Sequence, residues 1–155
     1  MKMLRLIISA LLLLFTASCG YEVVKNSSQL NYSINQLDIK GDNQINSILN
    51  KKLINRKNLG NISKSLKLSL ITESKTNTTS QDSMGNASSY QLTVDINILV
   101  KTNDGREFEK LFTKNTNYNN LNSKFELRQY ERTLKKNLTN DIFSEINRYL
   151  SSLVE

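Results

Sequence analysis

The sequence YQLTVDINILV, residues 90–100, alternates apolar and polar side chains along most of its length. Successive side chains of a β-strand point to opposite faces of the sheet, so this pattern predicts a strand with one buried face and one wet face. Asn103-Asp104-Gly105 follows, and an Asp-Gly pair tolerates the positive φ angles of a tight turn. Residues 90–112 therefore predict an antiparallel hairpin.

The second strand of this hairpin contains an unusual lysine. Lys110 shares a face with Phe108 and Phe112, and a charged side chain is costly on a fully buried face. One interpretation is an edge strand, on which an inward lysine prevents sheets from aggregating. The other is a contact between Lys110 and an anion.

Two more strands are predicted upstream. Leu66, Leu68 and Leu70 alternate with polar residues, and the polar stretch 73–89 is expected to form either a long hairpin loop or two ragged strand extensions. The earliest strand contains Tyr32, Ile34, Leu37 and Ile39. Its phase slips at Asn35-Gln36, which predicts a β-bulge.

Two helices complete the pattern. Asp42 is placed to cap a helix that carries Ile45, Ile48, Leu49 and Leu53 and ends near Gly60. Residues 123–126, Ser-Lys-Phe-Glu, form a capping box that begins a long final helix. The apolar stripe of that helix consists of Leu127, Tyr130, Leu134, Leu138, Ile142, Ile146, Tyr149 and Leu153.

The order β-α-β-β-β-α predicts an α+β fold, a two-layer sandwich in which two helices cover one face of a four-stranded, mainly antiparallel sheet. Residues 32–155 are expected to form this single domain. The other sheet face, rich in Thr, Asn, Asp and Gln, requires solvent or a wet partner.

The amino terminus has the features of an export signal. Lys2 and Arg5 precede an apolar run that is too short to span a bilayer, and the run ends at Thr16-Ala-Ser-Cys19. This ending resembles a bacterial lipobox. The resemblance implies a lipoprotein signal peptide over residues 1–18, a lipid on Cys19, and a tether over residues 19–31.

Cys19 is the only cysteine of the chain, so it has no partner for an internal disulfide. Three acyl chains on it would give a durable membrane anchor. Gly20 follows it where inner-membrane lipoproteins often carry Asp, which favours the outer membrane. The alternative is ordinary secretory cleavage after Ser18, which would leave a soluble protein with a free thiol.

The residue types needed for most catalysis are missing. The chain has no histidine, so Ser-His and Cys-His nucleophilic sites are excluded and most zinc sites are disfavoured. Glu107 and Glu109 share one strand face without the apolar setting that raises a carboxyl pKa. We expect no enzyme activity, no cofactor and no metal.

Removal of residues 1–18 leaves a net charge of +5. A nucleic acid is not the usual partner of an exported protein, so the alternatives are an anionic membrane component and a charge that only aids solubility.

An ordered set of segments resembles LptE, the lipopolysaccharide-assembly lipoprotein, in its alphaproteobacterial form. These segments are Cys19-Gly20-Tyr21, the strand and helix from Ile34 through Asp42 to Leu53, residues 68–74, Ser89–Val94, the Asp104-Gly105 turn, and Asn117-Tyr118-Asn119 before the final helix.

The resemblance implies a role at the outer membrane, on its periplasmic side. The LptE lipoprotein sits inside the LptD β-barrel, supports and plugs it, and assists insertion of lipopolysaccharide into the outer leaflet. Charge alone suggests Lys101, Arg106, Lys110 and Lys136 as contacts to lipopolysaccharide phosphates. Two alternatives are a periplasm-facing lipoprotein that binds an apolar ligand or chaperones lipoproteins, and a hydrolase with an unrecognised carboxylate site.

Overall fold

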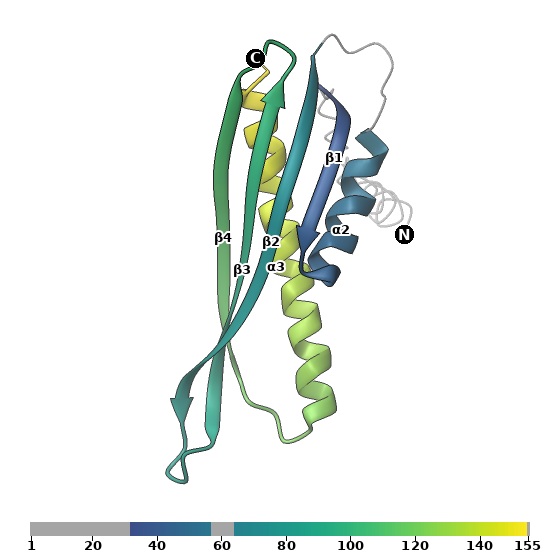
Figure 1. Ribbon diagram of the computed structural model, residues 1–155. Coiled ribbons are helices and arrows are strands. Elements are labelled where there is room, and N and C mark those ends of the chain that lie inside the picture. Colours follow the sequence, from purple (N-terminus) through teal and green to yellow (C-terminus); the bar gives the residue numbers. More distant parts are fainter. Residues whose placement is uncertain (1–31, 57–63, 155) are drawn as a thin grey trace, which may run out of the picture.

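A computed structural model describes residues 32–56 and 64–154 (Figure 1). The elements are β1 (Ser33–Gly41), α2 (Asn43–Leu53), a 3-10 turn (Ile54–Arg56), β2 (Ser65–Gln81), β3 (Ala87–Thr102), β4 (Glu107–Asn119) and α3 (Lys124–Ser152). The expected signal peptide, Cys19 and the tether lie outside the described residues. Among the described helices, none is both long and apolar enough to cross a bilayer.

The sheet has the strand order β1-β2-β3-β4. β1 pairs with β2 in parallel, and the other two pairs are antiparallel. Figure 1 shows both helices on the same face of the sheet. On β3, alternate side chains from Leu92 to Val100 are buried on that face. The predicted sandwich, its element order and its mainly antiparallel sheet are confirmed.

The bulge predicted in β1 is present. The register against β2 shifts between Ile34 and Gln36, so Asn35 is the extra residue. This shift pairs Leu37 with Leu68, and it keeps the apolar side chains of β1 on the helix side. The sequence slip at Asn35 therefore preserves the core and is not a defect in the strand.

The predicted cap of α2 is confirmed, but the helix is shorter than expected. The Asp42 carboxylate accepts hydrogen bonds from the backbone N–H groups of Gln44 and Ile45, at 2.9 and 3.1 Å. The α-helix ends at Leu53, and the next apolar residue, Ile54, is 51% exposed. Because Leu53 is the last buried side chain of the helix, packing does not favour another turn. Gly60, the predicted end, lies outside the described residues.

The polar stretch 73–89 forms strand extensions, which was the second of the two predicted alternatives. β2 continues to Gln81 and β3 begins at Ala87, so only residues 82–86 form the turn. Hydroxyl groups link the two strands, as between Ser80 and Ser88 at 2.6 Å. Figure 1 shows this hairpin arm, residues 76–90, extending beyond both helices.

The Asp104-Gly105 turn is confirmed. Lys101 and Glu107 are Cα partners, the Thr102 N–H donates to the Arg106 carbonyl at 3.0 Å, and Gly105 has φ +86. β4 is an edge strand, as one interpretation of Lys110 required.

The long final helix, α3, begins where the capping box predicted. The Ser123 hydroxyl accepts from the Glu126 N–H at 3.3 Å. Its stripe is buried mainly in the carboxyl-terminal half, where Phe143 and Leu150 join the predicted Ile142 and Ile146. In the amino-terminal half, fewer apolar side chains of α3 are buried against the sheet, and Tyr130 is 44% exposed. The core therefore lies under the carboxyl-terminal half of α3.

Candidate functional site

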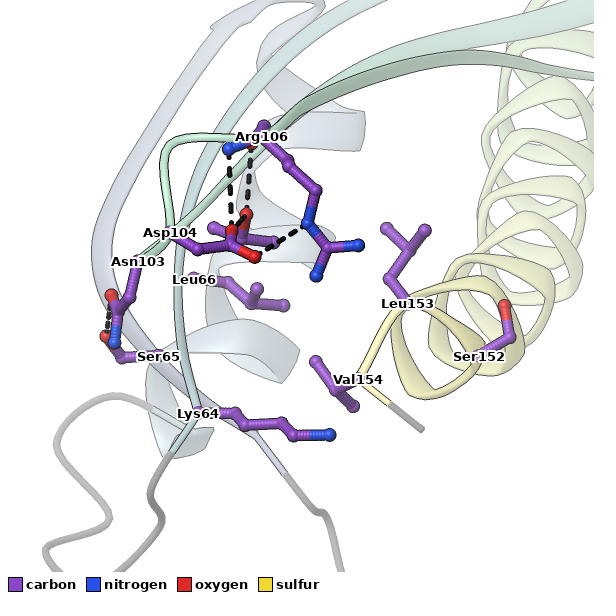
Figure 2. A pocket seen from close by; sticks show the side chains of 10 residues that line it. Lys64, Ser65, Leu66, Asn103, Asp104, Arg106, Ser152, Leu153 and Val154 are labelled. Atoms are coloured by element: carbon purple, nitrogen blue, oxygen red, sulfur yellow. Dashed lines mark hydrogen bonds and ion pairs between the residues drawn. The ribbon is translucent and has the colours of Figure 1, made fainter.

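A cleft of about 500 Å³ lies at one end of the molecule, between the start of β2, the β3–β4 turn and the end of α3 (Figure 2). Figure 2 shows the Arg106 guanidinium directed into this end cleft, opposite Leu153, with the Lys64 side chain on another side. The full lining is Lys64, Ser65, Leu66, Thr102, Asn103, Asp104, Arg106, Ser152, Leu153 and Val154. The cleft is thus partly apolar and has two cations.

Arg106 is partly neutralised in this cleft. Its Nε donates to the Asp104 carboxylate at 2.7 Å. The hydrogen bond from the Thr102 hydroxyl, followed by that from Arg106, holds the pKa of Asp104 below its usual value. The cleft wall is tied to the sheet, because Asn35 Nδ2 donates to Ser65 Oγ at 2.8 Å, and Ser65 donates to Asn103 at 2.5 Å.

Lys110 lies in a second, shallower pocket of about 370 Å³ between β4 and α3. Its ammonium group is 5.0 Å from the ring centre of Phe112 and 4.7 Å from that of Tyr149. Glu145 lies in the same pocket, and its carboxylate pairs with Lys114 at 2.6 Å. The hydrogen bond from Lys114 is the largest cause that lowers the pKa of Glu145. Two aromatic rings thus explain how the sheet accommodates a lysine on its helix side.

Lys101 and Lys136 lie elsewhere. Lys101 is on the open face of the sheet and forms an exposed ion pair with Glu107 at 2.6 Å. Lys136 is exposed on α3. Alternation along the strands places Lys101 and Lys110 on opposite faces of the sheet, so the four predicted cations do not form one site.

Sequence reasoning identifies Lys136 but misses three exposed cations that come before it on α3. Lys124, Arg128 and Arg132 precede it at intervals of four residues, and all are exposed. The signal that identifies them is the repeated four-residue spacing of cations within a predicted helix. We call these four residues the α3 cation row.

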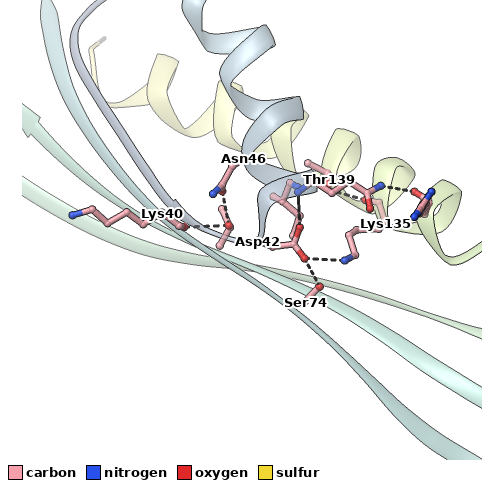
Figure 3. A network of polar contacts seen from close by, with 10 residues as sticks. Lys40, Asp42, Asn46, Ser74, Lys135 and Thr139 are labelled. Carbon is pink, nitrogen blue, oxygen red and sulfur yellow. Dashed lines mark hydrogen bonds and ion pairs between the residues drawn. The ribbon is translucent and has the colours of Figure 1, made fainter. Parts of the chain in front are cut away.

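Asp42 is at the centre of a polar network (Figure 3). Besides capping α2, its carboxylate accepts from the Ser74 hydroxyl at 2.7 Å and from the Lys135 ammonium at 2.8 Å. Burial alone would raise the pKa of Asp42. The hydrogen bonds from Lys135, Ser74 and the Ile45 N–H outweigh burial and lower the pKa from 3.8 to about 2. The network joins α2, β2 and α3.

A cluster of tyrosines lies at the base of the hairpin arm. The rings of Tyr90 and Tyr118 stack at 5.4 Å, and Tyr130 of α3 meets Tyr118 edge to face at 6.1 Å. The Tyr118 hydroxyl donates to the Glu131 carboxylate. Burial, and then the bond to Glu131, raise the pKa of Tyr118 well above its usual value. This cluster attaches the thinly covered half of α3 to the sheet.

The open face of the described strands is polar, as predicted, apart from Ala87 and three large apolar side chains. Ile71 and Leu111 flank Asn97 in one cross-strand row, and they are 61% and 59% exposed. Leu99 lies one row away on β3. The surrounding positions carry Thr, Asn, Asp, Glu and Lys. No described helix covers this face (Figure 1).

No protein-family model and no curated protein matches the chain. Several solved structures share its fold at 10–16% sequence identity. The rare lipoprotein B of Shewanella oneidensis matches with a TM-score of 0.59 and 14% identity, over 79% of this chain and 100% of its own.

Two further structures are similar. Lipoprotein B of Nitrosomonas europaea matches with a TM-score of 0.58 and 12% identity, over 80% of this chain and 87% of its own. A minor lipoprotein of Acinetobacter baumannii matches with a TM-score of 0.52 and 16% identity, over 78% and 92%. At these identities the matches establish a shared fold.

Proposed function

We propose that this chain is an outer-membrane lipoprotein of the LptE family, which supports and plugs an LptD-type β-barrel and assists insertion of lipopolysaccharide into the outer leaflet. The observation that carries the proposal is the match to the whole of the rare lipoprotein B chain of Shewanella oneidensis, a name that belongs to the LptE family. The segments quoted above resemble the same family independently of that match.

The open face of the sheet supports a position inside a barrel. Such lumens are polar and hydrated, and they accommodate a surface of amides, hydroxyls and charges. Large exposed apolar side chains, such as Ile71 and Leu111, are few on this face. A protein that buried the same face in a dry interface would leave polar groups such as Asn115 and Asn117 without partners.

Membrane attachment is proposed through Cys19. The short apolar run and the Thr16–Cys19 ending are the features that support it. A lipid at residue 19, followed by a tether to residue 31, would hold the domain on the periplasmic side of the outer membrane. The three similar structures quoted above are also described as lipoproteins.

The proposed role is stoichiometric and not catalytic. The chain has no histidine, and its carboxylates on the open face are engaged with other polar groups. Glu107 pairs with Lys101, and Glu109 accepts from Asn97 at 2.7 Å. Neither arrangement prepares a carboxyl group for acid-base chemistry.

The structure bears on how lipopolysaccharide phosphates would be contacted. Arg106, Lys110 and Lys101 each lie in a cleft with a second cation, which is Lys64, Arg148 and Lys67 in turn. Lys136 lies on open surface. Contacts to phosphates are therefore proposed to be distributed over several separate surfaces of the domain.

The alternative function, binding of an apolar ligand between the sheet and the helices, requires these layers to separate, because buried core side chains such as Ile96 and Ile142 occupy that space.

The proposal is tested by affinity purification of the tagged, full-length protein from membranes, with identification of the proteins that accompany it. A large outer-membrane β-barrel in near-equal amount is the expected companion. If the protein is recovered intact from the outer membrane without a barrel, the proposed function is wrong.

A further inference from the structure

The α3 cation row has a regular geometry. Lys124, Arg128, Arg132 and Lys136 are all exposed, and each is separated from the next by four residues. Four residues of α-helix rise by about 6 Å, and positions four apart are neighbours on the helix surface. The row therefore presents a line of positive charge about 18 Å long on the amino-terminal half of α3.

The cations of the row are not engaged in ion pairs with other described residues. Within residues 32–56 and 64–154, none of its four cations takes part in an ion pair. Glu131, which lies next to the row in sequence, instead accepts from Tyr118. Like charges four apart destabilise a helix, and this row contains three such pairs. An external anion placed against the row would relieve this repulsion.

The geometry favours a protein surface over a membrane as the source of that anion. A helix that lies in a membrane interface buries an apolar face among the lipids. The apolar side of this half of α3 is already used, because Leu127 and Leu134 pack against the core and Tyr130 contacts Tyr118. Two large apolar side chains of this half remain exposed, Phe125 at 63% and Tyr130 at 44%, and they do not form a continuous apolar face.

We propose that the α3 cation row docks onto an acidic protein surface, in which Asp and Glu carboxylates face the four cations. Arg128 and Arg132 would form bidentate pairs with carboxylates, and Lys124 and Lys136 would supply point charges at the two ends. This inference rests on the proposed function for the identity of the partner, which is then the barrel. Figure 1 shows the start of α3 extending past α2. The contact with α2 begins near Arg132, whose carbonyl accepts from the Gln44 side chain at 2.9 Å.

The test compares two double variants that change the net charge equally. The row variant carries Arg128→Gln and Arg132→Gln. The control variant carries Lys51→Gln and Lys52→Gln, which lie in the last turn of α2 and away from the open face of the sheet. Both should fold, and the thermal midpoint of the row variant should equal or exceed that of the wild type because repulsion has been removed.

In purifications from membranes, wild type and control variant should recover the barrel equally, and the row variant at least tenfold less. Recovery by the wild type should fall with added salt, and that of the row variant should change little. Equal recovery by the row variant, or an equal loss in the control, overturns the docking surface. In either case the wild-type result still supports the proposed function.

A second arm separates the two proposals. Polyglutamate of defined length should bind the wild type and the control variant but not the row variant, whether or not a barrel is found. If the wild type binds polyglutamate but recovers no barrel, the proposed function is wrong and the acidic docking surface is supported. If the row variant instead still binds polyglutamate but no longer binds phosphatidylglycerol vesicles, the row binds lipid and the inference is wrong.

Discussion

The Lys135 ammonium donates to the Asp42 carboxylate at 2.8 Å, across 93 positions of sequence. Both side chains are more than 80% buried. Asp42 also caps α2 and accepts from Ser74 of β2, so a single carboxylate fixes the position of α3 against α2 and the sheet. Together with the tyrosine cluster, this contact holds the amino-terminal half of α3 in place.

Replacement of Asp42 by Ala should destabilise the protein by about 2 to 4 kcal/mol. The loss combines a helix cap, about 1 kcal/mol, with charge-assisted bonds and a Lys135 charge left without its partner. Urea unfolding of the soluble domain measures it. Asp38→Ala removes only an exposed ion pair with Lys40 and should cost less than about 1 kcal/mol. Similar losses in the two variants would contradict the structural role of Asp42.

The same carboxylate predicts a pH dependence. The pKa of Asp42 falls from 3.8 to about 2 on folding, so the folded state holds this proton less tightly than the unfolded chain. Its contribution is complete well above pH 3.8 and is lost as the pH falls toward 2; it amounts to roughly 2 kcal/mol. Unfolding free energies between pH 2 and 6 should therefore depend less on pH in Asp42→Asn. Parallel curves for variant and wild type would refute this assignment.

Gly41 should tolerate no side chain. It has φ +113, and an added Cβ would lie 1.9 Å from the Thr72 carbonyl oxygen. Gly41→Ala should cost at least about 3 kcal/mol, because β1 and β2 must separate locally. Gly85 has φ +84 with open space around it, so Gly85→Ala should cost only the backbone strain, about 1 kcal/mol. Chemical denaturation of both variants compares the costs, and equal costs would show that the close approach is unimportant.

Combined Arg106→Glu and Lys136→Glu substitutions should weaken binding of lipopolysaccharide. Arg106 lies in the end cleft and Lys136 on α3, so the two effects should be independent and multiply. Because both side chains are exposed, each substitution should reduce the affinity for lipopolysaccharide about threefold, with a larger reduction at low ionic strength. Titration with labelled lipopolysaccharide at two salt concentrations provides the measurement. Unchanged affinity of the double variant would exclude both residues.

Cys19 should be the mature amino terminus and carry lipid. The short apolar run before Thr16–Cys19 motivates this prediction. Mass spectrometry of the membrane fraction should find an acylated peptide that begins at Cys19, and Cys19→Ser should give a soluble or uncleaved product. An unlipidated wild-type protein in the periplasm would show that ordinary secretory cleavage occurs instead.

Local signals in the sequence predicted most of the fold. The alternation in residues 90–100, the Asp104-Gly105 turn, the slip at Asn35 and the caps at Asp42 and Ser123 each depend on neighbouring residues only. The end of α2 was not predicted, because it depends on whether Ile54 finds a surface to pack against, and Ile54 is exposed. The Asp42–Lys135 contact joins distant residues, and no local pattern indicates it.

The candidate site was less predictable than the fold. Charge alone selected Lys101, Arg106, Lys110 and Lys136, and the structure places them on separate surfaces. Which face each cation occupies depends on strand register and helix orientation. For Lys110 the sequence did predict the helix side, but not the Tyr149 ring that accommodates it.

Native mass spectrometry of the full-length protein, purified from outer membranes in mild detergent, tests the central claim most directly. We predict a complex of one lipoprotein and one β-barrel protein, with the lipoprotein heavier than its mature sequence by the mass of its acyl chains. A lipoprotein that is found only as a free monomer or a homo-oligomer, under conditions in which barrel complexes stay intact, would contradict the proposed function.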